Sequence, residues 1–152
     1  MKIEDTISIT QLKQIEEITG DYKTPYDLLM KIKEAKNTLN LTYITIEDYL
    51  IRKFDEFFTY DFDNSSGVYF LNDFYIGKSN DLMSRMISHL KETIYPKRNK
   101  NSERNLKIIS SLKKDKICVS LLSEDVSDEA ILINKYNSTH NLTNKILYEN
   151  AK

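Results

Sequence analysis

Two short β-favouring runs with a two-residue connection most strongly constrain the fold of this chain. Residues 67–71 and 74–77 are rich in aromatic and β-branched side chains, and Asn72-Asp73 between them suits a tight hairpin turn. Residues 117–122 form a third run of this kind. We therefore expect three strands in this part of the chain, the first two of them paired as a hairpin.

Helical signals occupy most of the remaining chain. Thr24-Pro25 is typical of a helix start, because a capping hydroxyl precedes proline at the first helical position, and Thr45 is a second capping candidate. Asn80 or Asp81 can cap a helix that directly follows the hairpin. Apolar residues at helical spacing predict the helices after the hairpin, over residues 82–90, 106–112 and 132–136. The predicted order from residue 67 onward is therefore ββααβα.

A polar stretch at residues 61–66 divides the chain into two predicted parts. Residues 1–62 are expected to form a helical N-terminal appendage, and residues 63–152 an α+β domain. The formal net charge of −1 conceals an asymmetry, because residues 1–66 hold 8 basic and 13 acidic side chains, whereas residues 78–116 hold 11 and 4. A neutral chain is a poor nucleic-acid binder by charge alone, but this objection applies only to the acidic first part.

The single cysteine, Cys118, excludes an internal disulfide. With only His89 and His140 beside it, the chain also cannot build a Cys/His zinc site. We expect a reducing, intracellular and cytoplasmic location. No run approaches the roughly 18 apolar residues that a membrane span requires, so we expect no membrane association.

The hairpin carries two triplets, Gly67-Val-Tyr69 and Tyr75-Ile-Gly77, that resemble the paired signature of the GIY-YIG nuclease superfamily. Either triplet alone is a weak signal, but the resemblance extends over about residues 66–145. Only five residues separate the two tyrosines, which is fewer than is usual in the family. The downstream residues that match the family pattern in order are Lys78, Arg85, His89, Glu129 and Asn141.

The resemblance implies a small three-stranded antiparallel sheet flanked by helices. It also implies a metal-dependent endonuclease that hydrolyses DNA phosphodiester bonds. It implies that Tyr69 is the general base, that Tyr75 supplies a second hydroxyl, and that Lys78 assists. Arg85 would grip a phosphate, because a guanidinium binds phosphate oxygens in pairs. His89, four residues later on the same helix face, would orient the phosphate or share the base role.

Further expectations concern the metal and the supporting residues. Glu129 would be the sole protein ligand of one Mg²⁺ (or Mn²⁺) per active site, since Mg²⁺ keeps most of its waters. Gly67 and Gly77 would support the active site through close backbone approach, and Asn141 would tie the last helix to it. Each residue also has a purely structural interpretation: Arg85 as a solvated charge, His89 as a buried core histidine, and Glu129 as a partner of the helix dipole.

A basic run beside the predicted site would contact duplex DNA through phosphates. Its members include Lys97, Arg98, Lys100, Arg104 and Lys107. The alternative prediction is a non-catalytic nucleic-acid-binding or protein-docking module on the same scaffold. The N-terminal helices could also mediate a homodimer or bind a protein partner.

Overall fold

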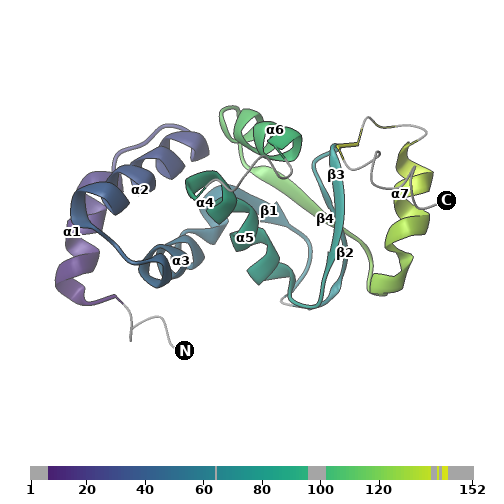
Figure 1. Cartoon of the computed structure of the whole chain (residues 1–152), viewed down its shortest axis with the longest axis horizontal. Coiled ribbons are helices and arrows are strands. Elements are labelled where there is room, and N and C mark those ends of the chain that lie inside the picture. Colours follow the sequence, from purple (N-terminus) through teal and green to yellow (C-terminus); the bar gives the residue numbers. More distant parts are fainter. Residues whose placement is uncertain (1–6, 64, 96–101, 138–139, 141, 144–152) are drawn as a thin grey trace.

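The structure is a computed structural model that describes residues 7–63, 65–95, 102–137, 140, 142 and 143 (Figure 1). Its class is α+β, with seven α-helices and four strands among these residues. The helices are α1 (Ile9–Thr19), α2 (Pro25–Leu39), α3 (Tyr43–Arg52), α4 (Phe54–Phe57), α5 (Leu82–Ile94), α6 (Ser102–Leu112) and α7 (Glu129–Asn137). The strands are β1 (Phe58–Tyr60), β2 (Gly67–Leu71), β3 (Tyr75–Ser79) and β4 (Ile117–Ser123), and a 3₁₀ turn, η2 (Val126–Asp128), precedes α7.

The sheet is four-stranded and mixed, with the order β1-β4-β2-β3. The predicted three-stranded antiparallel sheet is therefore wrong, because β1 adds a strand that pairs in parallel with β4. Strand β2 pairs antiparallel with both β3 and β4. The three residues of β1 directly follow a helix and look like part of its apolar stripe in the sequence. Only the pairing of Phe58 with Ile117, distant in the chain, makes this segment a strand.

The hairpin turn spans three residues rather than the predicted two. Leu71 pairs with Tyr75, and the Phe74 amide donates to the Leu71 carbonyl at 3.1 Å. Asn72 adopts a left-handed conformation with φ of 45°, which asparagine tolerates better than most residues. Its side-chain oxygen accepts from the Cys118 amide at 2.8 Å, so the turn is anchored to β4.

Helix starts follow the capping rules, with one correction. Thr24 caps α2 as predicted, and its hydroxyl accepts from the Asp27 amide at 3.0 Å. Thr42 caps α3 in place of Thr45, because its hydroxyl accepts from the Thr45 amide at 3.1 Å. Asp81 caps α5 through the Ser84 amide, which fixes the start of the helix that carries Arg85 and His89.

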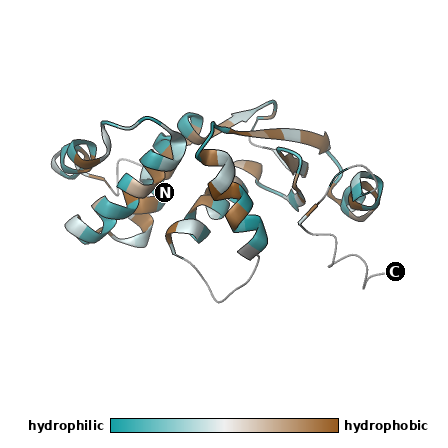
Figure 2. Cartoon of the chain, turned by 90° about the horizontal axis from the view of Figure 1, so that it is seen from above, coloured by the Kyte–Doolittle hydropathy of each residue, from teal (hydrophilic) through white to brown (hydrophobic). Residues whose placement is uncertain are grey.

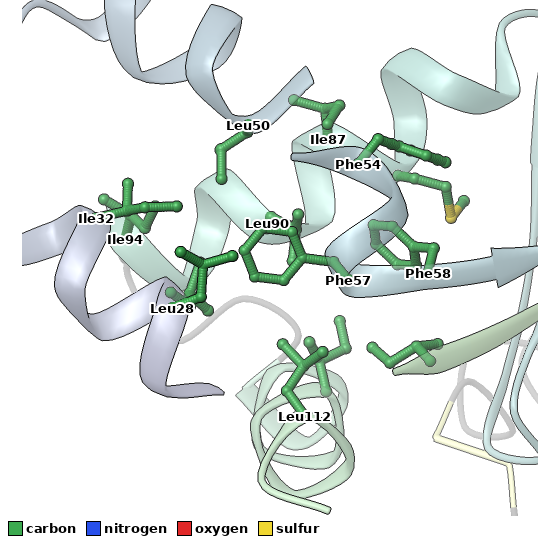
Figure 3. Close-up of a cluster of buried hydrophobic side chains, with 14 of the residues drawn as sticks. Leu28, Ile32, Leu50, Phe54, Phe57, Phe58, Ile87, Leu90, Ile94 and Leu112 are labelled. Atoms are coloured by element: carbon green, nitrogen blue, oxygen red, sulfur yellow. The ribbon is translucent and has the colours of Figure 1, made fainter. Parts of the chain in front are cut away.

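The N-terminal helices and the sheet share one hydrophobic core. In Figure 3, Leu28 and Ile32 of α2, Leu50 of α3 and Leu90 of α5 approach one another beside Phe57. Figure 2 shows apolar residues along the strands and on parts of the helices. The division at residue 62 stays a prediction, but the described residues on both sides of it pack together. Across this described part of the chain, none of the helices has both the length and the apolarity that a membrane span needs.

The two faces of the sheet have different covers (Figure 1). Tyr69 and Leu71 belong to the main core with α5 and α6, whereas Val68 and Phe70 pack in a smaller cluster with Ile133 of α7. This split follows from strand geometry, since successive side chains point to opposite faces. The same alternation decides which predicted site residues lie together.

Candidate functional site

Four of the predicted catalytic residues meet between the hairpin and α5. Tyr69 lies on β2, Tyr75 on β3, and Arg85 and His89 are one turn apart on α5. The ring centroids of the two tyrosines are 6.2 Å apart, and the His89 ring lies 5.9 Å from Tyr69 and 5.7 Å from Tyr75. Gly77 makes this packing possible, because a Cβ atom there would lie 2.4 Å from the Tyr69 hydroxyl oxygen.

A hydrogen bond joins the two most deeply buried members of the site. The Tyr69 hydroxyl lies 2.7 Å from His89 Nε2, and the two residues are 0% and 1% exposed. On the other side of the imidazole, Nδ1 lies 3.9 Å from a carboxylate oxygen of Glu92. Because a carboxylate attracts the protonated ring nitrogen, we assign the proton to Nδ1, so that Nε2 accepts from the Tyr69 hydroxyl.

The electrostatics of this pair keep both groups neutral at physiological pH. Burial lowers the pKa of His89 well below its ordinary value, and the charges of Arg104 and Arg85 lower it further. Burial raises the pKa of Tyr69, as does Tyr75, while Arg85 and Arg104 oppose the rise without cancelling it. The Tyr69–His89 pair is thus a neutral hydrogen bond with two guanidinium groups beside it.

Arg104 and Glu92 belong to the site, and the sequence did not indicate this role for either of them. Arg104 forms an ion pair with Glu92, and its guanidinium carbon lies 5.1 Å from the centroid of the Tyr75 ring. One of its nitrogens also donates to the Tyr75 hydroxyl at 3.5 Å. Arg104 is only 3% exposed, which contradicts its predicted place on a DNA-binding surface. The spacing of Glu92 after Arg85 and His89 places it on the same helix face, and this pattern could have identified it as a site residue. No feature of the sequence distinguishes Arg104 from a surface arginine.

The solvent-accessible end of the site consists of Tyr75 and Arg85, which are both partly exposed. Burial alone would lower the pKa of the Arg85 guanidinium, but the nearby hydroxyls of Tyr69 and Tyr75 outweigh it and raise this pKa above its ordinary value. The general-base role was predicted for Tyr69, but its complete burial leaves no path to a water molecule in this conformation. Tyr75 is therefore the tyrosine whose position suits contact with water or substrate.

Lys78 and Glu129 form a separate pair on the other face of β3. Lys78 Nζ lies 3.9 Å from Glu129 Oε1 at the first residue of α7. Strand alternation directs Tyr75 and Gly77 towards α5, and Ile76 and Lys78 towards α7. The predicted residues are thus divided between two faces of one strand instead of forming a single cluster.

Glu129 is the predicted metal ligand and could supply one carboxylate to a hydrated Mg²⁺ or Mn²⁺. Its side chain is 18% exposed and supplies hard carboxylate oxygens, and the separation of 3.9 Å from Lys78 is longer than a direct hydrogen bond. Within the described residues, no group of three or more His, Cys, Asp or Glu side chains is arranged to hold an ion. A single carboxylate suffices only for a cation that keeps most of its waters, as Mg²⁺ does.

The remaining predicted residues have varied locations. Gly67 lies where β2 closely approaches β4, and a Cβ there would be 2.5 Å from the Ser123 carbonyl oxygen. Lys107 is exposed on α6. Four others lie outside the described residues: Lys97, Arg98, Lys100 and Asn141.

Comparison of the chain with models of protein families, with curated proteins and with solved structures finds no significant match. Function must therefore be inferred from the residues themselves. A partly exposed arginine beside two tyrosine hydroxyls can bind an oxyanion, and the neutral histidine behind them fixes the position of one of these hydroxyls. This chemistry suits a phosphate group or a comparable anion.

Proposed function

We propose that this chain is a GIY-YIG-type endonuclease that hydrolyses DNA phosphodiester bonds with the help of a divalent cation. The observation that carries the proposal is the position of Arg85, a partly exposed arginine one helical turn from His89 and beside the cluster of the Tyr69, Tyr75 and His89 rings. The order of the motif residues along the chain adds support.

In the proposed reaction, Arg85 binds the non-bridging oxygens of the scissile phosphate and stabilises the negative charge that develops on them. The Tyr75 hydroxyl orients the attacking water by a hydrogen bond, and Arg104 holds the Tyr75 ring in place. The Tyr69–His89 hydrogen bond holds the Tyr69 hydroxyl beside Arg85. Tyr69 and His89 therefore position the groups that contact the substrate.

Glu129 would hold the cation, which when bound lowers the pKa of a coordinated water and neutralises phosphate charge. Strand β3 lies at the edge of the sheet, so the two faces of the sheet meet along this strand. A DNA strand that follows this edge contacts Arg85 on one face and the Lys78–Glu129 pair on the other.

The test is cleavage of supercoiled plasmid in Mg²⁺ or Mn²⁺ by the wild type and by Arg85→Ala. We expect nicked or linear product from the wild type and a loss of roughly 100-fold or more in the variant, as for removal of one charge-stabilising donor. Arg52→Ala is the matched control, because Arg52 is exposed at the end of α3, and it should cut normally. Tyr75→Phe should lose more activity than Tyr69→Phe.

Absence of cutting with both metals, or full activity of Arg85→Ala, would contradict the proposal. A second candidate is a non-catalytic nucleic-acid-binding module, favoured by the complete burial of Tyr69 and His89. It predicts salt-sensitive DNA binding by the wild type without cleavage in either metal. Binding through the N-terminal helices to a second copy or another protein stays a prediction.

A further inference from the structure

A small pocket adjoins the candidate site at the junction of α3 and α5. Its volume is about 200 Å³. Arg85 and Glu92 line it and also belong to the site described above, so the pocket continues directly from the accessible end of that site. The other lining residues are Tyr43, Ser88, Lys91 and Tyr95.

The lining is rich in hydrogen-bond donors and cations. Tyr43 is the first residue of α3, Tyr95 follows α5, and their rings are 5.1 Å apart. Lys91 Nζ lies 4.6 Å from the centroid of the Tyr43 ring, and Lys36 Nζ of α2 lies 4.6 Å from that of Tyr95. Helices α3 and α5 thus line one polar pocket, and Lys36 of α2 lies over one of its lining rings.

The carboxylates near this pocket already have partners. Glu92 forms an ion pair with Arg104, and Glu47 forms one with Lys91. Since both carboxylates are matched by a cation, Arg85 and Lys36 add positive charge that these pairs do not neutralise. An anion is therefore the complementary ligand.

The Tyr95 hydroxyl is an independent indication that the pocket holds a ligand with hydrogen-bonding atoms. Its oxygen is buried and has no hydrogen-bond partner among the described residues. Tyr43, by contrast, is 50% exposed, so the pocket is open on its side. A buried hydroxyl without a partner is unfavourable, and an anionic oxygen in the pocket would satisfy it after a small movement of the Tyr95 side chain or its neighbours.

We propose that this pocket binds a second phosphate of the substrate strand, next to the phosphate held by Arg85. The proposal rests on the proposed function and extends it, because it makes the N-terminal helices part of the substrate-binding surface. The hydroxyls of Tyr43 and Ser88 donate to the oxygens of this second phosphate, and the Tyr95 hydroxyl does so once its side chain has shifted. Lys91, which is paired with Glu47, also lines the pocket. The ligand chemistry is that of two phosphates separated by one nucleoside.

The test is calorimetric titration of the whole chain with thymidine 3′,5′-bisphosphate, thymidine 5′-monophosphate and inorganic phosphate. We expect the bisphosphate to bind about tenfold more tightly than either single phosphate, which corresponds to one additional charge-assisted hydrogen bond. The double variant Tyr43→Phe/Tyr95→Phe keeps both rings but lacks both hydroxyls, and it should lose this preference. Tyr26→Phe is the matched control, since Lys113 also lies over that ring at 4.9 Å, away from the pocket lining.

Equal affinities of the wild type for the three ligands, no binding of any of them, or an unchanged preference in the double variant would each overturn the proposal. Thermal unfolding of the double variant verifies that it is folded. The plasmid assay distinguishes the two proposals. Cleavage without a bisphosphate preference refutes only the second phosphate site, whereas a preference without cleavage supports that site and refutes the endonuclease.

Discussion

The buried imidazole of His89 makes the stability of this protein depend on pH in a predictable direction. The pKa of His89 lies well below its ordinary value, because burial and the charges of Arg104 and Arg85 disfavour the imidazolium. In the unfolded chain the histidine titrates near its usual pKa of about 6.5. As the pH falls below about 6.5, the unfolded state therefore binds a proton that the folded state does not bind. The contribution of the neutral His89 to stability is therefore fully present above this pH and is lost progressively below it.

The size of this effect follows from proton linkage. Where the folded state stays unprotonated, His89 alone lowers the free energy of unfolding by about 1.4 kcal/mol at pH 5.5 and about 2 kcal/mol at pH 5, relative to pH 7.5. Urea denaturation at these three pH values measures it. Carboxylates also titrate in this range, so the informative quantity is the difference between the wild type and His89→Gln.

The wild type should lose about 1.4 kcal/mol more than His89→Gln between pH 7.5 and pH 5.5. If His89→Gln shows the same loss as the wild type, the imidazole is not held neutral in the folded protein, and the assigned Tyr69–His89 hydrogen bond is wrong.

Three further substitutions test the packing around the site by urea denaturation at neutral pH. Gly77→Ala should cost about 1–3 kcal/mol, because its methyl group would displace the Tyr69 ring, and a cost near zero would contradict the close packing. Arg104→Met should cost about 3–5 kcal/mol by leaving the Glu92 carboxylate unpaired, and a stability equal to the wild type would show that the pair is not buried. Thr42→Ala should cost about 1 kcal/mol as loss of a helix cap, whereas an effect at Thr45 alone would restore the original prediction.

Local sequence signals predicted much of the candidate site. The positions of Arg85 and His89 on one helix face follow from their spacing, and strand alternation directs Tyr69 and Tyr75 to the same side of the hairpin. The same alternation separates Lys78 from them, although the motif order alone suggested one cluster. Burial was not predictable from these signals, because it depends on the elements that pack against each residue.

The amino-acid sequence determined the local elements: the hairpin, the Thr24 cap, the helix after Asp81 and the α+β class. These depend on interactions between residues close together in the chain, which a single sequence displays directly. Only the tertiary structure decided that Phe58 begins a strand and that Arg104 is a buried partner of Glu92. Both outcomes require contacts between separate elements of the chain, and neither residue carries a local signal that distinguishes it from a helical phenylalanine or a surface arginine.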